Sequence, residues 1–373
     1  MDCVCIVHNF TKESYSGLSF ELAHHLAKKG VDVLFISHRP YFEKPLFIND
    51  YKGFIHVYSW PTKKRPTDAK SFFWFARIFL KYHPSKLIGH FVGSNISAIA
   101  AKILSSWRTQ TLIYYHTLSH AIKLDYKGSD MSLNIKRLRK KFFYNIFCDI
   151  IVCPSDLAKK DFIGVYGSKR KSGKCQVVIN PIIDRFKGFA QPGNMNTIKI
   201  SYLGRLEPTK GVNEMLDGFI NHRSEDSSRI ILHIAGAGPL EDKIKDTCSK
   251  HPQIIFEGYK NYDEVDDYIR KSDFMILPSL SDNLPTVGLE SLMNGVPILL
   301  SEKTGLADYI LDGEEGYLFQ PSVKGISDVL ERAKSYIYKR EAMAIMARQK
   351  YLNKFGVNTY LDRMNEVLQL HRK

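Results

Sequence analysis

Residues 281–297 have the sequence SDNLPTVGLESLMNGVP and follow an apolar run, residues 274–277, that is typical of a buried strand. The stretch enters a helix that its closing Gly-Val-Pro must end. Two carboxylates, Asp282 and Glu290, therefore lie on either side of one strand-to-helix turn. Strand, polar loop and helix in this order form the repeating unit of α/β proteins, so the stretch predicts that fold class.

The loop of this turn suits an anion that carries hydroxyl groups. Main-chain N–H groups are available at Asn283, Leu284 and Thr286, whereas Pro285 has none. The N-terminus of the following helix favours negative charge. The amides would bind a phosphate, and the two carboxylates would bind sugar or ribose hydroxyls. Because the same pattern also occurs as a plain structural turn, other motifs have to decide between the two interpretations.

Both halves of the chain repeat the pattern of strand, loop and helix. In the first half we expect strands at 3–7, 32–37, 55–60, 87–91, 111–115, 150–153 and 176–180, with helices at 17–29 and 94–105, the second capped by Ser94. In the second half we expect strands at 198–203, 230–235, 254–257, 274–277 and 297–301, followed by helices at 323–344, 348–355 and 359–371. This alternation predicts two doubly wound parallel sheets, with ligands bound at the carboxyl ends of the strands in a cleft between the domains.

The domain boundary is expected at a polar connector, residues 188–196, which is rich in Gly, Pro and Asn. We place an N-terminal Rossmann-like domain at 1–187 and a C-terminal one at 188–356. The closing helix, about 357–373, is expected to cross back onto the first domain.

Composition narrows the class of protein. The 373 residues are 44% hydrophobic, which is enough for two domains of ordinary size. No run of about 20 apolar residues occurs, and the N-terminus lacks the basic region of a signal peptide, so we expect a cytoplasmic protein. Six scattered cysteines without a CxxC pair predict buried thiols rather than a zinc site or a disulfide framework.

The net charge of +14 is distributed unevenly. Residues 1–190 contain 30 Lys and Arg against 13 Asp and Glu, whereas the remainder contains 23 against 26. The basic first half therefore predicts an anionic partner, either a membrane surface or nucleic acid.

The loop 204–211 leaves an expected strand and enters a helix, with Arg205 and Lys210 near its two ends. Both cations can reach one diphosphate, the Arg as a bidentate fork and the Lys as a point charge. A solvated loop with two ordinary basic residues is the alternative. An anion-binding turn in the same domain favours the diphosphate interpretation.

Two further loops follow strands of the same domain. Residues 235–239, Ala-Gly-Ala-Gly-Pro, fall short of the dinucleotide fingerprint GxGxxG, so Gly236 either lets a nucleotide approach the backbone or serves a structural turn. Tyr259 follows the next strand, where it either borders a nucleobase or is simply exposed.

The first domain offers two candidates. Gly17 begins the helix expected after the first strand, where a backbone would have to approach a phosphate. His116 follows the strand at 111–115 and would project into the cleft. With an unperturbed pKa near about 6.5, its imidazole could bind a sugar hydroxyl or assist proton movement.

Taken together, these loops resemble the retaining enzymes of glycosyltransferase family 4, which have the GT-B fold. The resemblance covers essentially the whole chain and is strongest over residues 198–320. It rests on Gly204-Arg205 with Lys210-Gly211, on residues 235–239, on Phe256-Glu257-Gly258, on Asp282 to Glu290 with Asn294-Gly295-Val296-Pro297, and on residues 304–310 and 312–316. Each motif alone is weak, but their order and spacing are specific.

The resemblance implies a metal-independent hexosyl- or N-acetylhexosaminyl-transferase that uses a UDP- or GDP-sugar and no other cofactor. Arg205 and Lys210 would hold the donor diphosphate, on which negative charge grows as the sugar leaves. Glu290 would bind the ribose hydroxyls and Asp282 the transferred sugar, whereas His116 would lie near the acceptor and the reacting carbon. The resemblance also implies retention of configuration. We expect front-face substitution, because no residue in the sequence identifies itself as a covalent nucleophile.

This sequence departs from the family pattern at two places. The first acid is commonly Glu, and Asp282 is one methylene shorter, which bears on the choice of sugar. The glycine-rich N-terminal loop is reduced to Ser16-Gly17. No Asp-x-Asp follows a strand, and we expect the acidic cluster 263–267 to be a solvated helix face, so no metal site is predicted.

Residues 62–86 and 133–147 concentrate the positive charge and mix it with aromatic residues. Such helices suit the interface of an anionic membrane, where a lipid-linked acceptor would be presented. The alternative places the aromatics in the core and the lysines on a solvated face. A nucleic-acid partner is not expected, because no recognisable binding module accompanies the charge.

The leading hypothesis is therefore transfer of a sugar from a nucleotide donor to a hydroxyl of a saccharide or lipid-linked saccharide. We place it in cell-surface polysaccharide synthesis (capsule, O-antigen or exopolysaccharide), peripheral on the cytoplasmic face of the inner membrane. A nucleotide-sugar epimerase on the same fold and a non-catalytic membrane-bound scaffold are the alternatives.

Overall fold

The computed structural model describes residues 3–8, 14–37, 46–62, 64–91, 93–125, 129–167, 174–189, 197–222 and 229–369. The chain divides into two compact units. The N-terminal unit consists of Met1–Ser119, Tyr126–Ile183 and Tyr360–Lys373, and the C-terminal unit consists of His120–Asp125 and Asp184–Thr359. Most of the expected connector, residues 190–196, lies outside the described residues.

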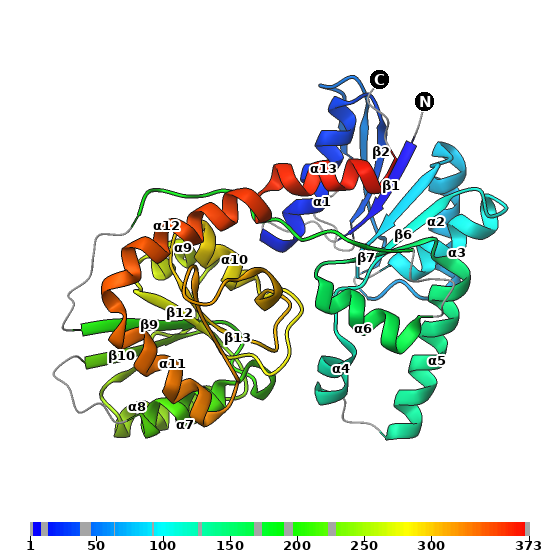
Figure 1. The fold of residues 1–373 in the computed structure, drawn as a ribbon. Coiled ribbons are helices and arrows are strands. Elements are labelled where there is room, and N and C mark those ends of the chain that lie inside the picture. Colours follow the sequence, from blue (N-terminus) through cyan, green and yellow to red (C-terminus); the bar gives the residue numbers. More distant parts are fainter. Residues whose placement is uncertain are drawn as a thin grey trace. The chain divides into compact units, whose positions relative to one another are not determined.

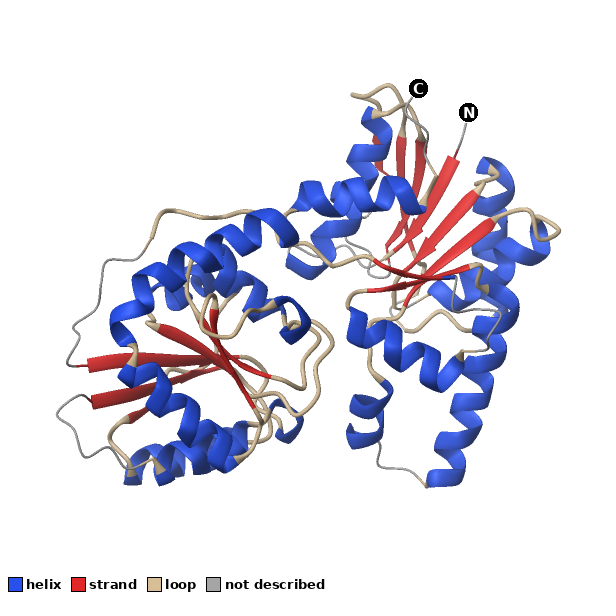
Figure 2. Cartoon of the chain, viewed as in Figure 1, coloured by secondary structure: helices blue, strands red, loops and turns tan. Residues whose placement is uncertain are grey.

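The N-terminal unit contains an eight-stranded sheet (Figures 1 and 2). Its strands are β1 (Cys3–Val7), β2 (Asp32–Ser37), β3 (Leu46–Ile48), β4 (Ile55–Ser59), β5 (Lys86–Gly89), β6 (Gln110–Tyr114), β7 (Ile150–Cys153) and β8 (Cys175–Val177). Their order is β3-β4-β2-β1-β5-β6-β7-β8, and all pairs are parallel except β3 with β4. The direction of winding reverses between β1 and β5, so the carboxyl edge there is the expected place for a ligand.

Helices cover both faces of this sheet. They are α1 (Ser14–Lys28), α2 (Ala69–Tyr82), α3 (Ser94–Leu104), α5 (Asp130–Phe147), α6 (Asp156–Tyr166) and α13 (Val357–Val367). The short helix α4 (Ser119–Asp125) belongs mainly to the C-terminal unit. In Figure 1, α1 and α13 lie on one side of the sheet and α2 and α3 on the other. Tyr360 and Met364 of α13 are buried in the same core as Leu18 and Leu22 of α1. The closing helix therefore completes the N-terminal unit.

The C-terminal unit contains a six-stranded parallel sheet. Its strands are β9 (Thr197–Leu203), β10 (Arg229–Ala235), β11 (Ile254–Phe256), β12 (Phe274–Leu277), β13 (Ile298–Ser301) and β14 (Gly316–Phe319). Their order is β11-β10-β9-β12-β13-β14, so this sheet reverses its winding between β9 and β12.

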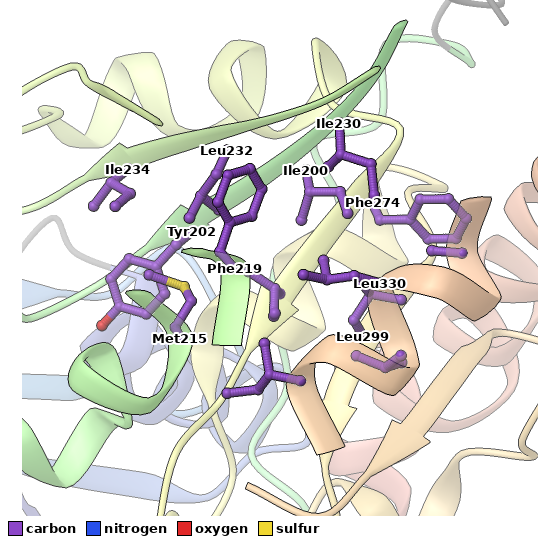
Figure 3. Close-up of a cluster of buried hydrophobic side chains, with 14 of the residues drawn as sticks. Ile200, Tyr202, Met215, Phe219, Ile230, Leu232, Ile234, Phe274, Leu299 and Leu330 are labelled. Carbon is purple, nitrogen blue, oxygen red and sulfur yellow. The ribbon is translucent and has the colours of Figure 1, made fainter. Parts of the chain in front are cut away.

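The helices of this unit are α7 (Val212–Asn221), α8 (Glu241–Lys250), α9 (Tyr262–Arg270), α10 (Thr286–Met293), α11 (Val323–Ser335) and α12 (Arg340–Lys350). Helices α7 and α11 pack together, whereas α10 lies against α9 and α12. Figure 3 shows the core between the sheet and the first pair, where Ile200 and Phe274 of the strands meet Phe219 of α7 and Leu330 of α11. Burial of these side chains stabilises each by about 2 kcal/mol.

The predicted α/β class with two doubly wound domains is confirmed, but local details differ. Strands β3 and β14 were not predicted. The helix predicted at 323–344 is wrong, because α11 ends at Ser335 and α12 begins at Arg340. The cap predicted at Ser94 is also wrong. Gly93, with a φ of 83°, precedes α3, and the Ser94 hydroxyl instead donates to the Phe91 carbonyl at 2.8 Å.

Candidate functional site

In the C-terminal unit, two loops flank the point where the sheet reverses its winding. One loop leaves β9 and contains residues 204–211, and the other leaves β12 and contains residues 278–285. Since β9 and β12 are neighbours in the sheet, the two loops meet at its carboxyl edge. Crevices of this kind are where open α/β sheets bind ligands.

The two loops bring a cation and a carboxylate into contact. The Lys210 ammonium donates to Asp282 Oδ2 at 2.5 Å, and each side chain is about one-fifth exposed. Arg205 is anchored through its backbone, because the Tyr202 hydroxyl donates to its carbonyl at 2.7 Å. Its guanidinium contacts Glu207 at 2.9 Å and is 64% exposed. Two cations therefore lie in the loop after β9, each paired with a carboxylate, and Arg205 is the more exposed of the two.

Gly211 permits the close approach of the two loops. It has a φ of +70°, and a Cβ atom at this position would lie 1.9 Å from the Pro278 carbonyl oxygen. The Leu280 amide donates to the Thr209 carbonyl at 3.1 Å and fastens one loop to the other. A larger residue at position 211 would therefore separate Lys210 from Asp282.

Gly211→Ala is expected to destabilise the C-terminal unit by at least about 2 kcal/mol, because it adds a clash to the cost of a left-handed backbone. Gly258→Ala is the matched control, since Gly258 has the same φ of +70° but no atom within 4 Å of the added Cβ. Urea unfolding measures both variants. Equal losses of free energy of unfolding would contradict the importance of the Pro278 contact.

The glycine turn at residues 235–239 packs against the arginine loop. The Leu206 amide donates to the Ala237 carbonyl at 2.9 Å, and a Cβ at Gly236 would lie 1.8 Å from the Gly204 carbonyl oxygen. The φ of Gly236 is +144°. Contact between two loops of the protein itself is therefore sufficient to require glycine here, which favours the structural interpretation of the turn.

Helix α10 starts at the turn that follows Asp282. The Gly305 amide donates to the Asp282 carbonyl at 3.0 Å, so the segment after β13 fixes the backbone of Asp282. Asn283 is buried. Across the described part of the chain, no hydrogen bond takes the main-chain N–H groups of Leu284 and Thr286. These amides remain available to an anion at the start of the helix.

Glu290 lies in α10 and is only 4% exposed. Arg185 Nη2 contacts Glu290 Oε1 at 3.4 Å, and the same guanidinium donates to Asp266 at 2.7 and 3.1 Å. The Asn294 amide donates to Asp266 Oδ1 at 2.9 Å. Glu290 thus belongs to a buried network of one cation and two carboxylates.

The acidic cluster 263–267 is not uniformly solvated, so that prediction is wrong for Asp266. Asp263 and Asp267 are exposed, whereas Asp266 is 8% exposed and lies on the face of α9 that packs against α10. The forked ion pair with Arg185 offsets the cost of burying its carboxylate.

Tyr259 is 68% exposed, in the loop after the edge strand β11. The Gly236 amide donates to the Gly258 carbonyl at 2.9 Å, so Tyr259 follows a residue that touches the glycine turn. The neighbouring Glu257 carboxylate contacts His233 at 2.7 Å and Lys260 at 3.1 Å.

In the N-terminal unit, three histidines follow the neighbouring strands β1, β5 and β6. His8 Nδ1 and Ser19 Oγ are 2.6 Å apart, Ser19 Oγ and His90 Nε2 are 3.3 Å apart, and His90 Nδ1 and His116 Nε2 are 3.1 Å apart. The rings of His8 and His90 stack with centroids 4.3 Å apart. Phe91 stacks on His116 with centroids 3.9 Å apart. This histidine cluster lies where the first sheet reverses its winding.

The expectation of an unperturbed pKa for His116 is wrong. Burial, with His8 nearby, lowers the pKa of His116 to about 3. Burial alone lowers the pKa of His8 to about 3, and burial with the two neighbouring imidazoles lowers the pKa of His90 well below its usual range. The cluster is therefore neutral at pH 7, and His116 is better suited to hydrogen bonding than to carrying a charge.

The histidine cluster predicts a loss of stability in mild acid. Imidazoles in the unfolded chain take up protons near pH 6.5, whereas His8 and His116 in the folded chain do so only near pH 3. The free energy of unfolding should therefore have its full value above about pH 6.5 and fall as the pH decreases toward 3. His8→Gln should lessen this slope, as followed by urea unfolding between pH 7.5 and 5. An unchanged slope would contradict the low pKa.

Asp161 of α6 fixes the loop that carries His116. The Tyr115 hydroxyl donates to its carboxylate at 2.5 Å, and Ser119 donates through its amide at 2.8 Å and its hydroxyl at 2.5 Å. One carboxylate thus holds both ends of the segment from Tyr115 to Ser119.

Gly17 does not stand at a helix start. Helix α1 begins at Ser14, so Gly17 is its fourth residue. A Cβ there would meet Ile183 Cδ1 at 3.5 Å, which is an ordinary van der Waals contact. The fold therefore does not require glycine at this position.

Sequence reasoning missed His8, His90, Arg185 and Asp161. His8 directly follows the run expected as the strand at 3–7, so its place after a strand was a usable signal, whereas His90 fell inside the strand expected at 87–91, which in the structure ends at Gly89. Arg185 and Asp161 act through contacts that depend on how the helices pack, and no local pattern marks them.

The two basic stretches differ in structure. In α2, Phe75 and Phe79 are buried, so the core alternative holds for them, whereas Phe73 is 70% exposed. In α5, Phe143 is buried, but five apolar side chains are 40–75% exposed. These residues, which we call the α5 stripe, are Met131, Ile135, Leu138, Phe142 and Ile146. Lys63 lies outside the described residues.

The α5 stripe has positive charge beside it. Lys136, Arg139 and Lys141 are exposed on the same helix. Partial burial and the neighbouring cations Arg65 and Lys136 lower the pKa of Lys140, which places Arg65 of the first basic stretch near α5. None of the helices in the described ranges has the length and apolar character needed to cross a membrane. Those ranges likewise contain no group of three or more His, Cys, Asp and Glu residues that could hold a metal ion.

Comparison with known proteins identifies two family models that together cover residues 19–350. Residues 19–184 match "Glycosyltransferase Family 4", and residues 184–350 match "Glycosyl transferases group 1". Glycogen synthase from Mycobacterium tuberculosis is 27% identical over 165 residues, which are 43% of this chain and 40% of that protein. The capsular polysaccharide biosynthesis glycosyltransferase CapM from Staphylococcus aureus is 22% identical over 214 residues, 55% of this chain and 54% of CapM.

The chain thus matches about half the length or less of these two curated relatives. Among solved structures, HepE from Anabaena in complex with UDP superposes over 100% of both chains with a TM-score of 0.74 and 13% identity, a likeness of fold. Both halves of the chain match the models of one enzyme family, and the two sheets have its architecture. The chain therefore belongs to glycosyltransferase family 4 and has the GT-B fold.

Proposed function

We propose that this protein is a retaining glycosyltransferase that moves a sugar from a UDP- or GDP-sugar to a hydroxyl of a saccharide or lipid-linked saccharide. The observation that carries the proposal is the ion pair of Lys210 with Asp282 where the second sheet reverses its winding, with Arg205 in the same loop as Lys210. The complex of HepE with UDP supports a nucleotide donor.

In this proposal the diphosphate replaces the carboxylate of Asp282 as the partner of Lys210. Arg205 swings its exposed guanidinium onto the same diphosphate. Negative charge grows there as the sugar leaves, so the two cations stabilise the transition state more than the ground state. Asp282, released from the ion pair, binds hydroxyls of the transferred sugar. Neutralisation by two side chains makes a divalent metal unnecessary.

The nucleoside end of the donor would lie along α10. The amides of Asn283, Leu284 and Thr286 donate to phosphate oxygens, and Glu290 accepts hydrogen bonds from the ribose hydroxyls. Gly236 and Tyr259 would border the base.

The acceptor side would be formed by the histidine cluster. Because His116 is held neutral, we propose that it binds a sugar hydroxyl near the reacting carbon rather than acting as a charged acid. In front-face substitution, the bond from the anomeric carbon to the diphosphate breaks and the acceptor oxygen attacks the same face. The acceptor proton passes to the departing diphosphate.

We further propose that the enzyme works on a membrane surface, in synthesis of a cell-surface polysaccharide. CapM, a capsular polysaccharide biosynthesis glycosyltransferase, supports the pathway. The α5 stripe supports the surface, because its residues recur at the helical spacing of four, three, four and four and have basic residues beside them. Anionic lipid at the cytoplasmic face of the inner membrane would complement this charge.

A screen of donors tests the catalytic proposal. The protein is incubated separately with UDP-glucose, UDP-galactose, UDP-N-acetylglucosamine and GDP-mannose, without acceptor. One donor should raise the melting temperature and be hydrolysed slowly to a sugar whose first-formed anomer retains configuration. EDTA should leave the rate unchanged. Conversion of the donor to an epimer would instead identify an epimerase, and stabilisation by none of them would favour a scaffold.

A further inference from the structure

Arg185 stands at the start of the C-terminal unit, in the segment Asp184–Phe189, yet its side chain reaches two helices. Its guanidinium donates to Asp266 of α9 through Nε at 2.7 Å and Nη2 at 3.1 Å. Nη1 donates to the Tyr262 hydroxyl at 2.7 Å, and Nη2 contacts Glu290 Oε1 of α10 at 3.4 Å. Four contacts fix a planar group with five donors in one orientation.

These contacts are unequal. The short, forked pair joins Arg185 to Asp266, which Asn294 also contacts, whereas the contact from Arg185 to Glu290 is longer. A buried carboxylate that accepts hydrogen bonds from a fixed guanidinium loses rotational freedom. The Arg185 contact at 3.4 Å uses one oxygen of the Glu290 carboxylate, and each carboxylate oxygen has two lone pairs.

We propose that Arg185 is a positioning residue that aims the Glu290 carboxylate at the two ribose hydroxyls of a nucleoside diphosphate. The proposal rests on the proposed function, which assigns the ribose to Glu290. It adds a residue outside the family motifs, on the segment through which the chain enters the C-terminal unit. The site would then depend on this segment and not on α10 alone.

The chain provides a matched control in Arg348 of α12. Arg348 donates to Asp184 at 2.9 and 2.7 Å and to the Met293 carbonyl at 3.0 Å, so it also ties the same segment to α10. No contact joins Arg348 to Glu290 among the described residues. Arg348→Lys therefore loosens the segment without touching the carboxylate.

The test measures binding of UDP, or of GDP if only that nucleotide binds, and donor kinetics of the full chain. Arg185→Lys keeps the charge but not the fork, so the Kd of the nucleotide and the KM of the donor should rise about tenfold while kcat changes less than about threefold. Arg348→Lys should leave both constants within about twofold. In a Glu290→Gln background, Arg185→Lys should raise the Kd of the nucleotide and the KM of the donor by less than about a further twofold.

Binding of a nucleotide without the 2′ and 3′ hydroxyls separates a positioning role from a purely structural one. The dideoxy nucleotide should bind the wild-type protein weakly and Arg185→Lys equally weakly. Equal weakening of UDP binding by Arg185→Lys and Arg348→Lys, with equal losses in melting temperature, would overturn the positioning role. Wild-type protein that binds neither UDP nor GDP would overturn the proposed function, whereas wild-type affinity in Arg185→Lys would overturn this inference alone.

Discussion

Lys210→Ala is expected to lower turnover of the nucleotide-sugar donor at least about 100-fold. The Lys210 ammonium lies 2.5 Å from Asp282, between the loops after β9 and β12, where a diphosphate would take the place of the carboxylate. Without the lysine, Asp282 would repel the phosphate instead of being released to bind the sugar. Steady-state kinetics with the donor that the protein hydrolyses measure the effect, which should fall mainly on kcat.

Lys245→Ala is the matched control for this prediction. Lys245 pairs with Glu241 at 2.7 Å on the surface of α8, so its removal breaks a comparable ion pair outside the crevice. Turnover should stay within about twofold of wild type. The turnover of Arg205→Ala should fall between those of Lys210→Ala and Lys245→Ala, because the Arg205 guanidinium is largely exposed before the donor binds. If Lys210→Ala keeps more than a third of wild-type turnover, the assignment of the diphosphate to this loop is wrong.

The double variant Leu138→Glu, Phe142→Glu is expected to reduce binding to anionic lipid vesicles at least tenfold, as about 25 cal/mol per Å² of buried apolar surface and about 1 kcal/mol per charge together predict. Both side chains are more than 60% exposed, so the fold should be preserved. Sedimentation with vesicles of phosphatidylglycerol and phosphatidylcholine measures the bound fraction. Wild-type binding should also weaken as salt rises.

Ile345→Glu is the control for this second prediction. Ile345 is 49% exposed on α12 of the C-terminal unit, so the variant adds one negative charge, where the double variant adds two, at an exposed apolar position outside the α5 stripe. Its vesicle binding should match that of wild type. A wild-type protein that does not sediment with anionic vesicles at low salt would remove the proposed membrane surface.

The sequence predicted the long apolar strands well because each is buried on both faces of a parallel sheet and therefore forms a continuous hydrophobic run. Strands β1, β2, β7 and β12 have the bounds that their apolar runs indicated. Strand β3, at the edge of its sheet, has three residues and two of them exposed, so no such run marks it. Short edge strands form because a neighbour offers hydrogen bonds, which a local pattern does not reveal.

The candidate site was predicted one loop at a time, but its assembly was not. The loops that carry Arg205 and Asp282 lie side by side because β9 and β12 are neighbours, and strand order is a property of the whole sheet. Asp266 was misjudged for a related reason. It stands among exposed acids in the sequence, and only the packing of α9 on α10 buries it beside Arg185.

The return of α13 to the N-terminal unit also determines the order in which the protein can be completed on the ribosome. His25 of α1 and Asn365 of α13 are 3.1 Å apart, and Met364 and Leu368 are fully buried in the core that α1 helps to form. All of residues 184–359 must be translated before these residues emerge, which takes roughly 9 to 35 s at about 5–20 residues per second. Throughout that interval the core that α1 forms with the strands lacks Tyr360, Met364 and Leu368, so the first domain to be translated has its full core only after α13 has been made.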